Sequence, residues 1–370
     1  MTTVTEDYVL PGGATAIRTL PKISLHDHLD GGLRPQTIID LAAEIGYELP
    51  TTDAVELGEW FSKQSDSGSL VEYLKTFDVT TAVMQTASGL SRVAREFVQD
   101  LGSDGVIYGE IRWAPEQHVA GGLTLDEAVE AVQAGLDAGV EDVRATGASI
   151  RVGQLVSAMR HADRGLEIAQ LAVRHRDNGV VGFDIAGAEA GFPAGNLRDA
   201  FDYLAQNYLP ATVHAGEADG LESIKGALFD GRALRLGHGV RLAEDITVES
   251  EDEEGSYVAL GPVAQWVKDR EIALELAPSS NLQTNAWGTE LHEHAFDLLY
   301  QLGFRVTVNT DNRLMSNTSL SRELFQLAET FGYDLDDLQV FQLNAAAAAF
   351  LPLEDREELA DQISAGFEKA

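Results

Sequence analysis

The sequence predicts an α/β protein, a (β/α)8 barrel of the TIM type. Eight short apolar or β-branched runs recur along the 370 residues, and helical patterns separate them. Near-continuous apolar strands that alternate with amphipathic helices are typical of a parallel sheet covered on both faces. Eight such units in a chain of this length favour a closed barrel over an open doubly wound sheet.

The expected strands share this apolar character and lie at residues 23–29, 106–113, 149–157, 180–186, 211–215, 234–240, 272–278 and 305–310. The amphipathic segments between them predict helices, among them residues 125–138, 164–178, 196–207 and 263–269. No Gly-x-Gly-x-x-Gly motif follows the first strand, which weakens a dinucleotide-binding alternative.

The segment between the first two strands is longer than a βα unit requires, by a factor of about two to three. Helical patterns at residues 33–45, 70–84 and 91–101 predict an inserted helical cap over the barrel mouth, roughly residues 33–105. Four apolar residues there fit either the gate of an apolar pocket or plain core packing: Leu70, Tyr73, Leu74 and Phe77. No Pro/Gly/Ser-rich linker interrupts the chain, so residues 1–370 are expected to form a single catalytic domain.

The net charge is −34, from 26 basic and 60 acidic side chains. Nucleic acids and anionic membranes are bound by basic patches, so this balance argues against both partners and mildly favours a neutral substrate. The acidic run at residues 249–254 is expected to be a solvated loop. There is no cysteine, so any metal must be held by His, Asp or Glu.

Residues 1–20 lack the basic segment and apolar core of a secretory signal. No apolar stretch approaches the roughly 20 residues that a membrane-spanning helix needs. A cytoplasmic protein is therefore expected.

Two histidines lie two residues apart where the first apolar run ends. In an extended strand, alternate side chains point to one face, so His26 and His28 project together. Two neutral imidazoles on one face can share a zinc ion. An isolated His-x-His motif is also compatible with two polar residues near a loop, so the other strand ends decide between these interpretations.

Polar side chains also collect at the ends of later strands, and the carboxyl ends of barrel strands converge on one face. Taken singly, each has an ordinary structural explanation, such as a buried hydrogen-bonded histidine or an acidic residue at a helix N-terminus. Taken together, they predict a metal site. These residues are Asp184, His214, Glu217, His238, Asp311 and Asn312.

Five motifs resemble the successive motifs of the adenosine deaminases, in the same order from about residue 20 to residue 351. They are His26-Asp27-His28-Leu29-Asp30-Gly31, His214-Ala215-Gly216-Glu217, Gly237-His238-Gly239, Ala277-Pro278-Ser279-Ser280-Asn281 and Asn309-Thr310-Asp311. The resemblance implies the (β/α)8 fold and the hydrolytic deamination of adenosine and 2′-deoxyadenosine to inosine and 2′-deoxyinosine, with release of ammonia.

The resemblance further implies one Zn²⁺ per chain, bound by His26, His28, His214 and Asp311, with a water completing the site. Zinc lowers the pKa of a bound water from ~15.7 toward about 7. By the same resemblance, His238 accepts a proton from this water, and Asp311 orients it.

Attack at C6 of a purine is helped by protonation of N1, which requires an acid that is still protonated near neutral pH. An ordinary glutamate, with a pKa of about 4.3, is ionised there. Burial can raise that value. Glu217, three residues after His214, is the acid that the resemblance implies.

The resemblance places His28, Asp30, Gly187 and Asn312 at the substrate. Asp30 matches a residue that binds a ribose hydroxyl, and adenine deaminases usually carry Glu there, so a nucleoside is favoured. Gly187 matches a backbone N–H donor to N3, although Ala188 departs from the usual Gly-Asp-Glu. Asn312 replaces the second carboxyl of Thr-Asp-Asp, thought to contact N7, and its amide donates at every relevant pH. Asn312 is also compatible with a simple helix cap.

Three alternatives remain open. One is a deaminase of another 6-aminopurine compound, such as aminodeoxyfutalosine, a modified nucleoside or adenine. Another is a hydrolase of esters or amides with a second metal bridged by a lysine, for which Lys22 and Lys225 are poorly placed. The last is a nucleoside-binding protein without catalysis, which would need neither Glu217 nor His238. The expected partners are a purine nucleoside and water, and the oligomeric state is left open.

Overall fold

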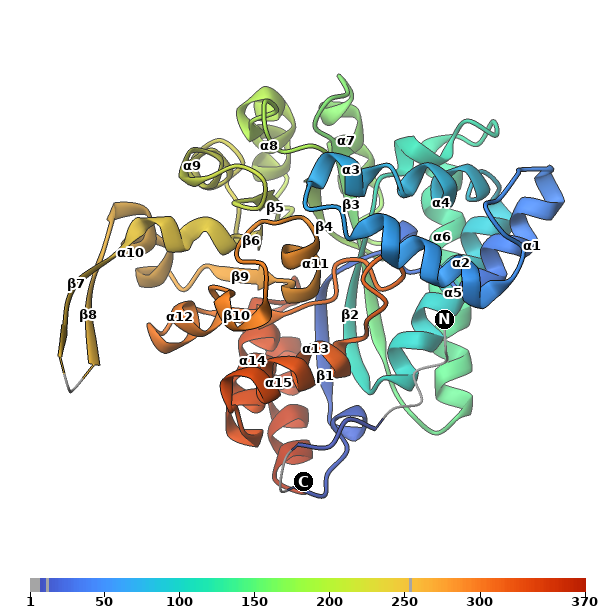
Figure 1. Ribbon diagram of the computed structural model, residues 1–370. Coiled ribbons are helices and arrows are strands. Elements are labelled where there is room, and N and C mark those ends of the chain that lie inside the picture. Colours follow the sequence, from blue (N-terminus) through green and yellow to red (C-terminus); the bar gives the residue numbers. More distant parts are fainter. Residues whose placement is uncertain (1–6, 11–12, 253–254) are drawn as a thin grey trace.

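The computed structural model describes residues 7–10, 13–252 and 255–370, and its centre is a closed parallel barrel (Figure 1). Two four-stranded parallel sheets form it, in the orders β1-β2-β3-β4 and β5-β6-β9-β10. The barrel strands are β1 Lys22–His28, β2 Val106–Trp113, β3 Arg151–Met159, β4 Val180–Ala186, β5 Thr212–Ala215, β6 Arg235–His238, β9 Ala273–Leu276 and β10 Val306–Val308. Each predicted strand therefore overlaps an observed one.

Two bridges close the two sheets into one barrel. Phe183 pairs with Ala211 at one seam, and Asp27 pairs with Asp311 at the other. At the second seam the His28 N–H donates to the Asp311 carbonyl at 2.8 Å, and the Asp311 N–H donates to the His26 carbonyl at 2.9 Å. The end of the first strand is therefore fixed beside the end of the last, and the predicted (β/α)8 barrel is confirmed.

Helices surround the barrel and bury one apolar face each. The longest, α6, begins at a capping box in which Thr124 and Glu127 exchange side-chain and backbone hydrogen bonds. The helices outside the cap are α6 Leu125–Ala145, α7 Gly165–Arg174, α8 Arg198–Gln206, α9 Leu221–Phe229, α10 Pro262–Asp269, α11 Pro278–Gln283, α12 Phe296–Gln301, α13 Leu320–Phe331, α14 Leu335–Ala348 and α15 Leu353–Phe367. Short 3-10 turns lie at η1 Ile17–Thr19, η2 Leu29–Gly31, η3 Pro115–His118, η4 Ala194–Leu197, η5 Val240–Asp245 and η6 Leu291–Glu293.

The predicted helical insertion between the first two strands is present, and its helices α1–α4 lie together on one side of the barrel (Figure 1). The single helix expected over residues 70–84 is wrong, because two short helices occupy that segment. Between them the chain makes i→i−3 hydrogen bonds, and the Thr76 hydroxyl donates to the Tyr73 carbonyl at 2.7 Å. The sequence analysis also missed α2. The insertion comprises α1 Pro35–Ile45, α2 Ala54–Ser65, α3 Leu70–Leu74, α4 Phe77–Val83 and α5 Ala87–Ser103.

The acidic run expected to be a solvated loop belongs largely to a β-hairpin, so that expectation is corrected. Strand β7, Ile246–Asp252, pairs antiparallel with β8, Gly255–Leu260. Val248 faces Val258 in the register, and such β-branched pairs favour a pleated ladder despite the neighbouring charges. Residues 253–254 lie outside the described residues. The hairpin projects from the body of the molecule on the side away from the cap (Figure 1).

Within the described part of the chain, no helix combines the length and apolar character needed to cross a membrane.

Candidate active site

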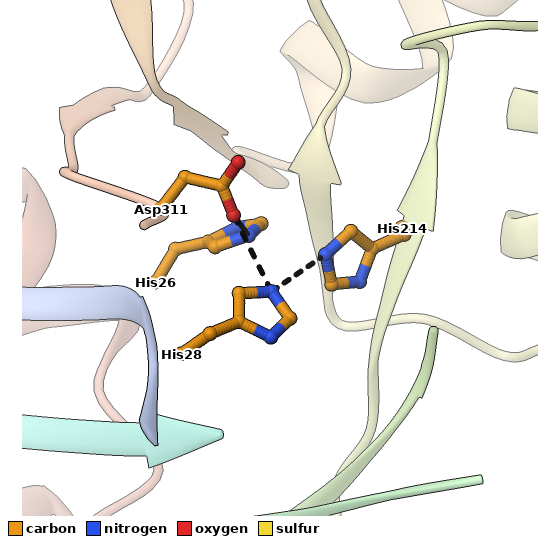
Figure 2. Close-up of side chains that lie close together, drawn as sticks. All are labelled: His26, His28, His214 and Asp311. Atoms are coloured by element: carbon orange, nitrogen blue, oxygen red, sulfur yellow. Dashed lines mark hydrogen bonds and ion pairs between the residues drawn. The ribbon is translucent and has the colours of Figure 1, made fainter. Parts of the chain in front are cut away.

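Four potential metal ligands meet at the carboxyl ends of β1, β5 and β10. One ligand atom from each of His26, His28, His214 and Asp311 lies within 4.8 Å of the others. Figure 2 shows the three imidazoles and the carboxylate converging on one point. Asp311 Oδ1 lies 3.1 Å from His26 Nε2 and 3.3 Å from His28 Nε2. The structure therefore brings together the four residues that the sequence analysis grouped.

The far nitrogens of two of these histidines face buried carboxylates. His26 Nδ1 lies 3.1 Å from Glu275 Oε2, and His214 Nδ1 lies 2.8 Å from Asp184 Oδ2. A carboxylate on Nδ1 fixes the proton there and leaves the lone pair of Nε2 directed at the centre, which is the arrangement of zinc-binding histidines. Both carboxylates are fully buried.

Arg112 joins the two carboxylates from inside the barrel. Its guanidinium donates to Asp184 at 3.1 Å and to Glu275 at 2.7 Å. Arg235 donates to Glu275 from the other side at 2.6 Å. Burial alone would raise the pKa of Glu275, but the two guanidiniums outweigh it and hold the pKa well below its usual range. The carboxylates behind the histidines are therefore ionised.

The residues of this cluster fit a zinc ion. Three imidazole nitrogens and one carboxylate oxygen form a borderline-soft donor set that suits Zn²⁺ and needs no cysteine. The Nε2 atoms of His28 and His214 lie 3.2 Å apart, and an ionised carboxylate lies 3.3 Å from His28, so a cation bound among them would be stabilised. Burial, partly offset by Asp311, lowers the pKa of His28 well below its usual value, which keeps this imidazole neutral.

Asp311 is held in a strained backbone conformation. Its φ of 57° lies in the left-handed region, which is uncommon for a residue with a side chain and is typical of functional sites. The Ser280 hydroxyl donates to Asp311 Oδ2 at 2.6 Å, and Oδ1 faces His26. Burial would raise the Asp311 pKa, but the hydrogen bond and charge of His26 hold it well below its usual range. This carboxylate is ionised.

Glu217 is positioned by the carboxylate of Glu189. Glu189 accepts backbone N–H groups of residues 216–219 at 2.6–3.0 Å, and the Ser223 hydroxyl donates to it at 2.5 Å. Thr284 donates to Glu217 Oε1 at 3.0 Å. Burial, together with the Asp311 and Glu189 charges, raises the Glu217 pKa well above its usual value. The pKa values of Glu217 and Asp311 are therefore shifted in opposite directions, a pattern typical of acid–base assignments.

His238 lies beside Glu217 and the histidine cluster. Its Nε2 is 3.5 Å from Glu217 Oε2, and its Nδ1 is 3.0 Å from Asn281 Nδ2. Its φ of 63° is in the left-handed region. Burial, with the neighbouring His26, lowers its pKa well below the usual value. An amide nitrogen can only donate, so Asn281 donates to Nδ1 and the neutral ring carries its own proton on Nε2, facing Glu217.

A cavity of about 460 Å³ opens over these groups. Its walls include Leu70, Tyr73, Leu74 and Phe77, for which the sequence left a gate and plain core packing open, so these cap residues line the cavity. The predicted substrate residues His28, Asp30, Gly187 and Asn312 line it as well, together with His214, Glu217, His238 and Asp311.

Two of these wall residues have features that suit a ligand. Asp30 is 7% exposed, its Oδ1 has no hydrogen-bond partner among the described residues, and burial raises its pKa to about 7. Gly187 has a φ of 95°, which residues with a side chain rarely adopt, so its backbone can turn at the cavity wall.

Apart from Asp184, sequence reasoning assigned no role to the groups behind the site. Glu275 and Arg112 stand within apolar strand sequences, Leu-Glu-Leu and Ile-Arg-Trp, where a charge demands a buried partner. That signal could have marked them, but the sequence does not show which charges pair. Asn281 and Ser280 lay in a quoted motif without an assigned function, and the structure places them on His238 and Asp311.

A family model described as adenosine deaminase matches residues 21–366. The chain is 58% identical over 341 residues to Adenosine deaminase 1 of Streptomyces coelicolor, covering 92% of this chain and 85% of that protein. It is 54% identical over 349 residues to the adenosine deaminase of Mycobacterium marinum, covering 94% and 95%. The crystal structure of an adenine deaminase from Arthrobacter aurescens matches with a TM-score of 0.81 at 23% identity, covering 95% and 100%, and shows the shared fold. The chain belongs to the adenosine deaminase family.

Proposed function

We propose that this protein catalyses the hydrolytic deamination of adenosine and 2′-deoxyadenosine, with Zn²⁺ as its single metal ion. The observation that carries the proposal is the pair of carboxyl groups facing one cavity. Glu217 is favoured in its protonated form, and Asp311 is ionised beside three histidines. The barrel, the cap and residues 1–370 as a whole would act as one catalytic unit.

His26, His28, His214 and Asp311 would hold the zinc. When bound, zinc supplies a water that is deprotonated near neutral pH, because the metal lowers its pKa toward about 7. Glu275 and Asp184 support this role, since each holds the far nitrogen of one ligand histidine.

The remaining groups perform proton transfers. Glu217, protonated in the resting site, donates its proton to N1 of the purine and makes C6 electrophilic. His238 would accept the proton of the attacking water at Nε2, which requires the ring proton on Nδ1 and the Asn281 amide turned so that its oxygen accepts there, and Asp311 would orient that water by accepting a hydrogen bond. Water oxygen bonds to C6, the proton held by His238 passes to the amino group, and the C6–N bond breaks to release ammonia. The remaining proton of the C6 hydroxyl returns to Glu217, which leaves the C6 carbonyl of inosine and restores the protonated acid. General acid assistance of this kind contributes roughly 10²–10⁴ in rate.

The cavity residues would select a nucleoside. The unpartnered Asp30 Oδ1 is a hydrogen-bond acceptor for a ribose hydroxyl, and His28 Nδ1 lies 4.0 Å from this oxygen. Gly187 would offer its backbone N–H to N3. Asn312 would donate from its amide nitrogen to N7. Curated relatives that are more than 50% identical carry the name adenosine deaminase, which supports adenosine over free adenine.

The lysine-bridged alternative finds no support from the two lysines considered. Lys22 lies at the start of β1, where its ammonium donates to the carbonyls of Ile17 and Leu20 at 2.7 and 2.8 Å. Lys225 lies on α9 and pairs with Glu222 at 2.6 Å. Neither belongs to the metal cluster.

The test is ammonia release from a panel of 6-aminopurine bases, nucleosides and nucleotides, with and without a chelator. We expect adenosine and 2′-deoxyadenosine to give the highest kcat/KM and the chelator to abolish turnover. A clear preference for adenine, a nucleotide or a modified nucleoside would overturn the substrate assignment, and turnover by fully metal-free protein would overturn the zinc assignment.

A further inference from the structure

An ion pair lies on the reverse side of the strand that carries two of the metal-ligand candidates. Asp27 stands between His26 and His28 on β1, and successive side chains of a strand point to opposite faces. The Nε–H of Arg313 donates to Asp27 Oδ2 at 2.7 Å. Asp27 is 0% exposed and Arg313 is 3% exposed, and neither lines the cavity over the site. The pair is therefore buried behind the metal cluster and outside the cavity.

The surroundings of Arg313 hold its guanidinium in one place. The Cζ atom lies 4.0 Å from the centre of the Phe97 ring on α5, and Nη1 lies 3.6 Å from Asp100 Oδ2 on the same helix. Gly32 borders the guanidinium on another side, where an added Cβ would lie 2.7 Å from Nη2. A planar guanidinium that stacks on a ring and pairs with carboxylates has little rotational freedom. Arg313 is therefore a fixed link between β1 and α5.

The segment after β10 carries Asp311 and needs such a link. β10 ends at Val308, so Asp311 stands beyond the last residue of that strand. Its left-handed φ of 57° costs free energy and persists only where surrounding contacts enforce it. The Leu314 N–H donates to the Gly31 carbonyl at 2.8 Å, so main-chain bonds join this segment to η2, which follows β1. Arg313 adds a charged side-chain link between the same two parts of the chain.

The metal cluster depends on how the Asp311 segment sits against β1. His26 and His28 belong to β1, and Asp311 Oδ1 lies 3.1 and 3.3 Å from their Nε2 atoms (Figure 2). A shift of the segment relative to the strand would alter both distances. Removal of residues that orient metal ligands from behind typically lowers metal affinity by about 10- to 100-fold.

We propose that Asp27 and Arg313 are positioning residues of the metal site. Their ion pair locks the segment after β10 against β1, and so holds the Asp311 carboxylate where it can share a zinc ion with His26 and His28. The pair acts from the face of β1 opposite the histidines, so it shapes the site without touching the metal or the substrate.

The first experiment removes the pair without leaving a buried charge unpaired. In the double variant Asp27→Val/Arg313→Met both positions are apolar, and Met keeps a contact with the Phe97 ring. We expect the metal-free double variant to bind Zn²⁺ about tenfold or more weakly than the metal-free parent, in competition with a chelator of known affinity. Arg313→Lys is the milder variant, because it keeps the cation but not the planar fork, and it should weaken binding several-fold. Parental zinc affinity in the double variant, or in Arg313→Lys if the double variant does not fold, overturns the inference.

The second experiment reports the geometry of the site. Co²⁺ bound in place of Zn²⁺ absorbs visible light, and its bands depend on the arrangement of its ligands. We expect the Co²⁺ spectrum of the double variant to differ from that of the parent. Arg151→Met is the control, because the pair of Arg151 with Asp355 at 3.3 Å also joins a barrel strand to a distant helix, but at the amino end of β3. A double variant with the parental spectrum, or a control that changes equally, overturns the positioning role.

The inference rests on the zinc site of the proposed function but not on the proposed substrate. A parent protein that binds no zinc would overturn both the zinc site and the inference. A parent that binds zinc tightly, with a double variant that binds it equally well, overturns the inference alone and leaves the proposed function standing.

Discussion

The Nε2 atoms of His28 and His214 lie 3.2 Å apart, although the two residues belong to β1 and β5 on different sheets of the barrel. His214 Nδ1 faces Asp184, which places the His214 proton on the far side of the ring. Two imidazole nitrogens at this separation are stable only when a proton or a cation lies between them. Asp311, 3.3 Å from His28 Nε2, adds a negative charge that favours the cation.

We expect purified protein to contain about one zinc per chain and to lose both zinc and activity in His214→Ala. A metal that binds only the folded state stabilises it by about 2.7 kcal/mol when the free metal concentration is about a hundred times Kd. A chelator should therefore lower Tm. His292→Ala is the control, since that side chain is 65% exposed and outside the cluster. Elemental analysis and calorimetry provide the readouts; an active, zinc-free His214→Ala protein would refute the assignment.

Glu217→Gln should separate chemistry from binding. The amide keeps the shape of the protonated carboxyl but has no proton to transfer, so kcat should fall by roughly 10²–10⁴. Zinc content and inosine affinity should remain close to the parental values, because Glu217 is not among the ligand candidates. Glu244→Gln serves as the control, because Glu244 forms an ion pair with Arg241 outside the ligand cluster. A loss of turnover smaller than about tenfold would remove Glu217 from the acid role.

The stability of the metal-free protein should depend on pH through Asp30. Burial raises its folded pKa to about 7 from 3.8, so between these values the folded state retains a proton that the unfolded chain has lost. Stability contributed by this group is complete below about pH 4 and declines as pH rises to about 7. Asp30→Asn mimics the protonated form and does not titrate. As pH rises through this window the parent loses stability and the variant does not, so the free energy of unfolding of the variant should gain on that of the parent by up to about 4 kcal/mol. Denaturant titrations at pH 4 and pH 7.5 measure the difference, and an unchanged difference would contradict the shift.

Arg112 should be required for both stability and metal affinity. Arg112→Met leaves Asp184 and Glu275 without the cation that joins them in the barrel interior, a change that costs about 3–5 kcal/mol for a buried pair. Arg174→Met is the control, because its pair with Asp126 is half exposed and is worth about 0–1 kcal/mol. Urea unfolding compares the two, and a zinc competition assay should show weaker binding for the Arg112 variant alone. Equal effects of both substitutions would show that Arg112 does not support the site.

The sequence by itself determined the barrel and the members of the site. The apolar runs are long enough to mark buried parallel strands, and the barrel topology brings every strand end to one face. Because His26, His28, His214 and Asp311 all stand at strand ends, their meeting could be predicted without coordinates. The helical pattern likewise located the cap, although it did not show the break between α3 and α4 or the strand character of the acidic run.

The tertiary structure alone decided how charges and hydrogen bonds are distributed behind the site. Arg112, Glu275 and Asp184 are far apart in the sequence and stand on strands that do not pair with one another, β2, β9 and β4. Only closure of the two sheets into a barrel brings them into contact. The protonation states of Glu217 and Asp311 also depend on the fold, because the pKa of a carboxyl is set by its burial and by the charges around it, not by its position in a motif. For the same reason the sequence could place Tyr73 on a helix of the cap, but only the folded structure shows that its side chain lines the cavity over the metal-ligand candidates.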